Sequence, residues 1–201
     1  MVFEGFEKDR FKGFIVTNSN KNKNLPLNFF NEENLKLEES IIISEFSDQK
    51  KLNVYSSIGY SSMNRDRQTA FKDIENFSTK LELKSFISKD AYVSKYVNIE
   101  KGSLILPRSI IEPNVVIKKG SVIWYGSQVC HDSNINEFCW IAASAVVGAN
   151  CIIGERSFLG IGAKVPTGSR LAKGNIISAG SIAPKFTSEN KVIISNKGDM
   201  K

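Results

Sequence analysis

Residues 135–147 read Ile-Asn-Glu-Phe-Cys-Trp-Ile-Ala-Ala-Ser-Ala-Val-Val, and this stretch contains the pattern that decides the fold. An aliphatic residue stands at every sixth position, and the residue four places after each one is small. Neither a helix, with a period of 3.6 residues, nor a single strand, with a period of 2, produces this spacing. Hexapeptide repeats of a parallel β-helix do, because six residues form one side of a coil. The pattern therefore predicts a parallel β-helix.

The repeat extends far beyond this stretch, without an insertion or a deletion. The sixteen aliphatic positions are Ile87, Val93, Ile99, Ile105, Ile111, Ile117, Ile123, Val129, Ile135, Ile141, Val147, Ile153, Leu159, Val165, Leu171 and Ile177. With three sides to a coil, residues 87–177 predict about five coils, stacked about 4.8 Å apart. The recurrent glycine three places after the aliphatic column, as at Gly120 and Gly162, indicates a turn with a positive φ angle.

Residues 1–84 follow a different pattern. Residues 13–17, 40–44 and 54–59 are candidate strands, and residues 64–80 have the apolar period of a helix. Short buried strands mixed with a helix are typical of a small α/β domain with a parallel sheet. We therefore expect three parts, which are an α/β domain, a β-helix over residues 85–182, and a C-terminal cap over residues 183–201. Caps are needed because the end of a solenoid exposes unpaired backbone.

Composition narrows the function. The net charge is +6 and the isoelectric point about 9.2, which suits polyphosphate ligands. The basic residues are scattered and no aromatic platform accompanies them, so we expect no nucleic-acid partner. No apolar run is long enough for a membrane span, and the start does not resemble a secretory signal, so we expect a cytoplasmic protein. Cys139 and Cys151 lie in the small-residue column, where a thiol acts as an apolar filler.

Two longer segments, residues 129–142 and 153–165, resemble a known family. They read Val-Cys-His-Asp-Ser-Asn-Ile-Asn-Glu-Phe-Cys-Trp-Ile-Ala and Ile-Gly-Glu-Arg-Ser-Phe-Leu-Gly-Ile-Gly-Ala-Lys-Val. The His-Asp dipeptide, followed two coils on by Gly-Ile-Gly-Ala, is similar to that of the NeuD/PglD/VioB-type acyltransferases. These are hexapeptide-repeat enzymes of bacterial surface-polysaccharide biosynthesis. The similarity covers about residues 10–185 and includes residues 57–59, before the last helix of the family's N-terminal domain.

The resemblance implies a left-handed β-helix assembled as a homotrimer, with acetyl-CoA between neighbouring subunits and no metal. It implies transfer of an acetyl group to an amine or hydroxyl of a sugar, usually a nucleotide-linked one. It also implies that the N-terminal domain is a truncated Rossmann-like unit. The Gly-rich turn with which the family opens has no counterpart here, so the domain is shortened or translation begins upstream of Met1.

Direct attack of an acceptor on a thioester needs a base, a donor to the developing oxyanion and good positioning. The resemblance implies that His131, the only histidine of the chain, is this base. Its ordinary pKa near 6.5 leaves an imidazole mostly neutral at pH 7. Asp132 matches the acidic residue that raises the basicity of the family's histidine. Without the resemblance, His131 would be interpreted as a surface residue and Asp132 as a turn residue.

The resemblance also implies contacts with acetyl-CoA and the acceptor. The candidate cofactor-binding residues are Trp140, Gly160, Ile161, Gly162, Ala179 and Gly180, and the candidate substrate-binding residue is Gly59. Trp140 is a departure, because the family has a second histidine there and an indole cannot take up a proton. It serves equally well as an aromatic filler of an interface. The basic residues Lys164, Arg170 and Lys173 are candidates for the phosphates of CoA, or form a solvated face.

Three alternatives compete with a sugar acetyltransferase. The departure at Trp140 and the absent Gly-rich turn favour a catalytically impaired trimeric scaffold of the same family. A zinc hydratase on the same fold needs three histidines, and the chain has one. A serine acetyltransferase carries a helical cap instead of an α/β segment. A thiol–imidazole pair of Cys130 and His131 is disfavoured, because neighbours on a strand point to opposite faces.

Overall fold

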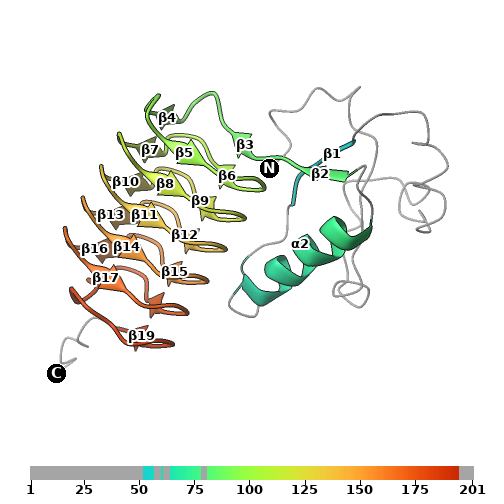
Figure 1. Cartoon of the computed structure of the whole chain (residues 1–201). Helices are drawn as coiled ribbons and strands as arrows, with labels where there is room; N and C mark the ends of the chain where they lie inside the picture. The colour runs from blue at the N-terminus through green and yellow to red at the C-terminus, as the bar shows by residue number, and fades with distance from the viewer. Residues whose placement is uncertain (1–51, 57–59, 61–63, 78–80, 195–201) are drawn as a thin grey trace, which may run out of the picture.

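The computed structural model describes residues 52–56, 60, 64–77 and 81–194. Figure 1 shows a column of stacked coils, with a helix and a short strand pair beside it. Each coil contains three short strands, and strands of successive coils pair in parallel to form three flat faces. The fold is therefore mainly β, with a parallel β-helix as predicted.

Each face is named here after a strand near its centre. The β10 face contains β4 (Tyr92–Val93), β7 (Ile110–Ile111), β10 (Gln128–Val129), β13 (Val146–Val147) and β16 (Lys164–Val165). The β11 face contains β5 (Asn98–Ile99), β8 (Val116–Ile117), β11 (Asn134–Ile135), β14 (Ile152–Ile153) and β17 (Arg170–Leu171). The β12 face contains β3 (Phe86–Ile87), β6 (Leu104–Ile105), β9 (Val122–Ile123), β12 (Trp140–Ile141), β15 (Phe158–Leu159), β18 (Ile176–Ile177) and β19 (Val192–Ile193).

The register follows the hexapeptide repeat through most of the column. Trp140 pairs with Val122 on one neighbouring coil and with Phe158 on the other. The last coil is two residues shorter, because Arg170 pairs with Phe186 and Ile177 with Ile193. The column consequently reaches about six turns, one more than the hexad pattern predicts. Strand β19 pairs with β18, and its Ile193 packs against the core. A C-terminal cap over residues 183–201 stays a prediction.

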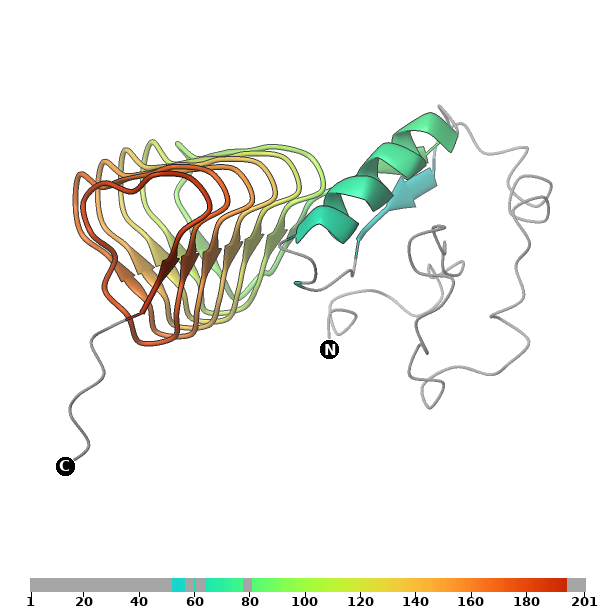
Figure 2. The same cartoon turned by 90° about the horizontal axis from the view of Figure 1, so that it is seen from below.

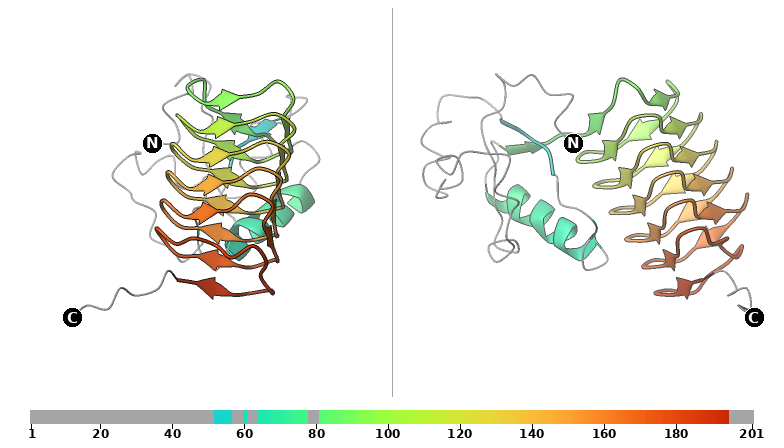
Figure 3. Two further views of the ribbon diagram at one scale, coloured as in Figure 1. Left: turned by 90° about the vertical axis from the view of Figure 1, so that its left-hand side faces the viewer. Right: turned by 180° about the vertical axis from the view of Figure 1, so that it is seen from behind.

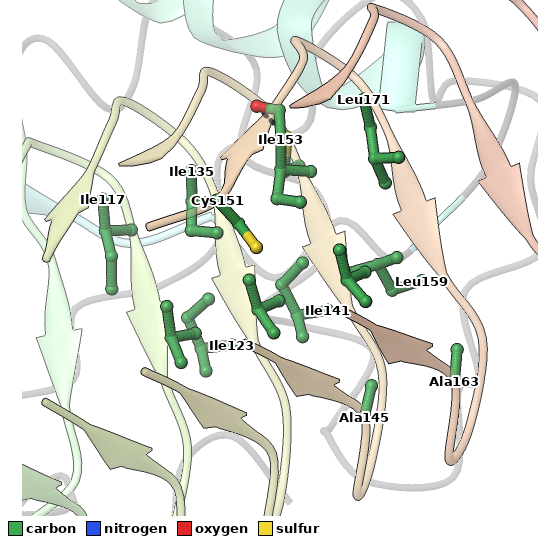
Figure 4. Packing of buried hydrophobic residues seen from close by; sticks show 14 of the residues in the cluster. Ile117, Ile123, Ile135, Ile141, Ala145, Cys151, Ile153, Leu159, Ala163 and Leu171 are labelled. Atoms are coloured by element: carbon green, nitrogen blue, oxygen red, sulfur yellow. Dashed lines mark hydrogen bonds between the residues drawn. The ribbon is translucent and has the colours of Figure 1, made fainter. Parts of the chain in front are cut away.

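The aliphatic column forms the core. From Ile105 to Ile177 every one of these residues is at most 3% exposed. Figure 4 shows members of this column between Ile117 and Leu171, stacked coil upon coil. Burial of one such side chain contributes about 1.5–3 kcal/mol. Serine hydroxyls of the small column donate to backbone carbonyls. Those of Ser103, Ser121, Ser133 and Ser157 reach the next coil, whereas those of Ser109, Ser127 and Ser169 bond within their own coil. For example, Ser133 Oγ donates to the carbonyl of Gly148 at 2.9 Å.

The corners between the faces have a positive φ angle at every sixth residue from Gly102 to Gly180. The residues at this position are Gly102, Arg108, Asn114, Gly120, Gly126, Asp132, Phe138, Ser144, Asn150, Arg156, Gly162, Gly168, Gly174 and Gly180. Left-handed backbone favours glycine and is tolerated best by Asn and Asp among the other residues. The predicted turn at this phase of the repeat is confirmed.

The described part of the N-terminal segment is a parallel strand pair with a connecting helix. Strand β1 (Leu52–Val54) pairs with β2 (Leu81–Leu83), and α2 (Arg65–Phe77) lies between them in sequence. Ala70, Phe71 and Ile74 are buried on one face of α2, as its periodicity predicts. The strands expected at residues 13–17 and 40–44 lie outside the described residues, so a Rossmann-like domain stays a prediction.

Helix α2 is attached to one row of corners of the column, and Figures 2 and 3 show it beside the coils. The guanidinium of Arg67 donates to the carbonyls of Gly120 at 2.8 Å, Gly102 at 2.9 Å and Ser56 at 3.1 Å. Burial lowers the pKa of Arg67 to about 9, so this group remains charged at neutral pH. Phe71 meets Phe138 edge-on, with ring centroids 5.3 Å apart. These contacts dock α2 on the column.

Candidate active site

His131 and Asp132 occupy the corner between β10 and β11. The corner geometry explains Asp132, whose φ is +59° and whose residue type tolerates left-handed backbone. Nδ1 of His131 lies 2.8 Å from Oδ2 of Asp132, and both side chains are more than half exposed. When Nδ1 carries the proton shared with Asp132, Nε2 is left with a free lone pair. The corner therefore presents a proton acceptor to the outside of the column.

The electrostatics of the corner favour a more basic imidazole. The hydrogen bond that His131 Nδ1 donates to Asp132 raises the pKa of His131 above its ordinary value, and the charges of Asp132 and Glu112 act in the same direction. The same hydrogen bond, together with one from Asn114, lowers the pKa of the Asp132 carboxyl. Asp132 thus stays ionised over the range in which His131 titrates.

Two residues of the preceding coil complete this corner, and neither belongs to a motif that marks it as functional in the sequence. The amide Nδ2 of Asn114 donates to Oδ1 of Asp132 at 3.1 Å. The backbone N–H of His131 donates to Oε2 of Glu112 at 2.8 Å. Asn114 stands eighteen residues before Asp132, one coil away, and this spacing is the signal that identifies such partners.

The candidate cofactor-binding glycines lie at a different row of corners, between the β12 and β10 faces. Gly162 and Gly180 have φ angles of +65° and +67°, and a Cβ added at either would meet nothing within 4 Å. The side chain of Ile161 is 64% exposed. An open corner with little side-chain bulk permits close approach of an extended ligand to the backbone.

The packing of adjacent coils explains why glycine occupies position 160. A Cβ added there would lie 2.5 Å from the backbone nitrogen of Ala179 on the next coil. Its backbone N–H donates to the carbonyl of Ile177 at 2.7 Å. Glycine at this position therefore reflects the tight stacking of adjacent coils.

The structure does not bring the two sets of residues together within one chain. The corner of His131 follows strand β10, whereas the corner of Ile161 and Gly162 precedes strand β16 of the same face. The two corner rows thus border opposite edges of the β10 face. Between them lies an outer row of Tyr92, Ile110, Gln128, Val146, Lys164 and Ile182, paired coil to coil.

Trp140 lies on neither of these corner rows. Its strand, β12, belongs to the third face, and its side chain is only 8% exposed. Its ring stacks on Trp124 with centroids 5.0 Å apart and meets Tyr60 edge-on at 6.4 Å. The indole thus packs against its own chain, and a contact with CoA stays a prediction. Gly59 lies outside the described residues.

Two of the three basic candidates already have partners. Arg170 donates to the backbone carbonyl of Asn150, and Nζ of Lys173 lies 3.3 Å from Oε2 of Glu189. Lys164 is exposed on the outer row of the β10 face. Among the three candidates for the phosphates of CoA, Lys164 is therefore the one whose charge is exposed on the β10 face, between the two corner rows.

The described residues contain no group of three or more His, Cys, Asp or Glu side chains that would hold a metal ion. All three cysteines are free, and burial raises the pKa of Cys139 to about 12. In the same described residues, no helix has the length and hydrophobicity of a membrane span.

Comparisons with known proteins agree with the fold. No family model and no curated protein matches the sequence. Among solved structures, the chain is similar to the acetyltransferase domain of PglB from Neisseria gonorrhoeae, with 22% identity, a TM-score of 0.66, and coverage of 74% of this chain and 72% of that one. It is also similar to PerB from Caulobacter crescentus in complex with CoA and GDP-perosamine, with 23% identity, a TM-score of 0.69, and coverage of 76% and 71%.

A further structure of the PglB domain, in complex with acetyl coenzyme A, has 24% identity and a TM-score of 0.62, with coverage of 66% of this chain and 63% of that one. At these identities the likeness is one of fold. The chain thus has the fold of NeuD/PglD-type sugar acetyltransferases, as the sequence resemblance predicts.

Proposed function

We propose that this chain is an acetyl-CoA-dependent acetyltransferase that acts on an amine or hydroxyl of a nucleotide-linked sugar in bacterial surface-polysaccharide biosynthesis. The observation that carries the proposal is the His131–Asp132 pair, exposed at a corner of a β-helix with the fold of sugar acetyltransferases. PglB and PerB were solved with acetyl coenzyme A, or with CoA and GDP-perosamine, and these ligands support the choice of substrates.

In the proposed reaction Nε2 of His131 accepts the proton of the attacking amine or hydroxyl. The acceptor atom forms a bond to the thioester carbonyl carbon, the C–S bond breaks, and the thiolate of CoA leaves and takes up a proton. Asp132 keeps the proton of the imidazole on Nδ1 and stabilises the imidazolium that forms. A general base of this kind contributes about 10²–10⁴ to the rate.

The proposal includes the left-handed winding and the homotrimer that the resemblance implies. The two candidate corner rows lie at opposite edges of the β10 face, so a site that uses both needs a second copy of the chain. The outer row of this face is rich in apolar residues, and Ile110 and Ile182 are 41% and 62% exposed. Such a surface suits packing against another subunit, with acetyl-CoA in the cleft between copies. We expect the enzyme to act in the cytoplasm.

An assay of acetyl-CoA with a panel of amino-sugar nucleotides tests the function. We expect release of CoA with at least one acceptor, and we expect His131→Ala to lower kcat by at least about 100-fold. Mass spectrometry of the product distinguishes an N-acetyl from an O-acetyl group. Acetyl transfer by His131→Ala at the rate of the natural chain would remove the assignment of the base.

The second candidate is a catalytically impaired scaffold. The burial of Trp140 in an aromatic cluster, at the place where the family has a histidine, favours it. Isothermal titration calorimetry with acetyl-CoA separates the two functions. An acetyltransferase binds acetyl-CoA below millimolar concentration, whereas a scaffold that has lost the cofactor site shows no heat of binding at millimolar ligand.

A further inference from the structure

The corner that holds His131 and Asp132 is supported by the corner of the preceding coil. The backbone N–H of Asp132 donates to the carbonyl of Pro113 at 3.2 Å, which stacks the two turns directly. Asn114 has the same φ angle as Asp132, +59°. The two side chains therefore leave equivalent points of adjacent coils, and they meet at 3.1 Å.

We infer that Asn114 is a positioning residue for the proposed general base, which acts by holding one oxygen of the Asp132 carboxylate so that the other faces the imidazole of His131. The geometry is a chain of two hydrogen bonds, from Asn114 Nδ2 to Oδ1 and between Oδ2 and His131 Nδ1 at 2.8 Å. The inference rests on the proposed function, because it assigns Asn114 a part in the same reaction.

Exposure is the reason that such a residue is needed. The side chains of His131 and Asp132 are 57% and 51% exposed, so packing does not hold either of them in place. An exposed ion pair is weak because two side chains lose rotational freedom when they form it, and because water competes for both partners. The amide of Asn114 restricts the Asp132 carboxylate before the imidazole approaches it. Less rotational freedom is then lost when the pair with His131 forms.

Glu112 supports the imidazole from the other side of the turn. Its Oε2 accepts the backbone N–H of His131, and its Oε1 accepts Nε2 of Gln128 at 3.3 Å. These bonds hold the main chain from which the imidazole projects. The preceding coil thus contacts both members of the pair, through Asn114 to the carboxylate and through Glu112 to the backbone.

The charged groups around His131 determine the sign of the expected effect. Asp132 and Glu112 are acidic, and Cys130 shares a hydrogen bond with Glu112. Arg170, two coils on, reaches the carbonyl of Asn150 on the following coil. If Asn114 only competed with His131 for the carboxylate, its removal would strengthen the remaining bond and raise the pKa of His131. If it positions the carboxylate, its removal loosens that bond, and the pKa of His131 falls.

The test is a pH titration of the imidazole by NMR in the full chain without a polyhistidine tag. His131 is the only histidine, so histidine labelled with ¹³C yields a single ring signal. Asn114→Gly removes the amide and keeps the left-handed turn. The matched control is Asn150→Gly, at the same corner of the following coil with φ +52°, whose Oδ1 accepts from Arg170 and not from the pair.

We expect Asn114→Gly to lower the pKa of His131, and Asn150→Gly to leave it in place. In an Asp132→Asn background, Asn114→Gly should produce no further shift, because both changes act through the same carboxylate. With a working acceptor, Asn114→Gly should lower kcat roughly tenfold with KM little changed, a part of the 10²–10⁴ that a general base contributes. Thermal unfolding by circular dichroism confirms that each variant is folded.

An unchanged or raised pKa in Asn114→Gly, or an equal fall in Asn150→Gly, would overturn the inference. The titration needs no substrate, so it is separable from the test of function. A fall in pKa with no acetyl transfer by the natural chain would support the positioning of the pair and remove the acetyltransferase assignment.

Discussion

At the residue scale, the properties of the candidate base come from its two neighbours in the turn. Asp132 has the left-handed φ that recurs at the corners, and its carboxylate lies 2.8 Å from the imidazole of His131. Aspartate at position 132 thus suits the backbone of the corner, and its charge also acts on the imidazole of His131. The hydrogen bond with Asp132 raises the pKa of His131.

This raised pKa predicts a pH dependence. The base must be neutral to accept a proton, so kcat/KM should increase as the pH rises through the pKa of His131. Because that pKa is raised, the acid limb of the profile should lie above the ordinary 6.5 of an imidazole. Asp132→Asn should lower the rate and move the limb to lower pH.

The pH–rate profiles of the natural chain and Asp132→Asn, measured with the same acceptor, check this prediction. A titration of the acceptor itself is common to both enzymes, so it does not contribute to the difference. Identical acid limbs in the two profiles would show that the carboxylate does not control the base.

At the scale of the elements, helix α2 and the glycine corners of the column depend on each other. A Cβ added at Gly102 would lie 2.3 Å from Cε1 of Phe71, which is completely buried and cannot move away easily. Glycine is needed here for space as well as for its φ angle of +72°. The helix therefore approaches the coils as closely as backbone without side chains permits.

We expect Gly102→Ala to destabilise the protein by about 3 kcal/mol, since it adds overpacking to the strain of a left-handed residue. The control is Gly168→Ala, at a corner with φ +77° where an added Cβ meets nothing within 4 Å. The control should cost only about 1–2 kcal/mol, from the backbone strain alone. Thermal unfolding at one protein concentration measures both, and equal melting temperatures would contradict the docking of α2 at this corner.

At the scale of the whole molecule, the β10 face and the β11 face differ in the outer rows they present. The β10 face lies between the two candidate corner rows, and its outer row includes Tyr92, Ile110 and Ile182, all exposed. The outer row of the β11 face alternates polar and apolar residues, which are Asn98, Val116, Asn134, Ile152 and Arg170. The more apolar face is the better candidate for contact between copies.

We expect the protein to elute with three times the 22.4 kDa mass of one chain in size-exclusion chromatography with light scattering. Ile110→Asp should dissociate the trimer, because it buries a carboxylate in an apolar contact. Ile152→Asp is the control, since Ile152 is 40% exposed on the β11 face and Ile110 is 41% exposed on the β10 face. A trimer that survives Ile110→Asp, or that dissociates equally with both, would exclude the β10 face as the interface.

The sequence alone determined the column, its core and the phase of its corners. In a stack of similar coils the same local environment recurs every six residues. The spacing of Ile135, Ile141 and Val147 is therefore sufficient to predict the column. The position of His131 and Asp132 at a corner follows from the same phase. Their proposed roles came from the family resemblance.

Only the tertiary structure revealed the departures from the hexapeptide repeat and the side-chain contacts between separate coils and elements. The last coil is two residues shorter than the others, so Ile193 of β19 does not fall on the six-residue spacing and the sequence pattern does not predict this strand. Trp140 packs on Trp124 and Tyr60, and α2 docks against Gly102 and Gly120. Asn114 meets Asp132 on the adjacent coil. The physical reason is the same for each of these contacts, because they join residues that are distant in sequence. Which side chains meet depends on their rotamers and not on the hydrophobic period.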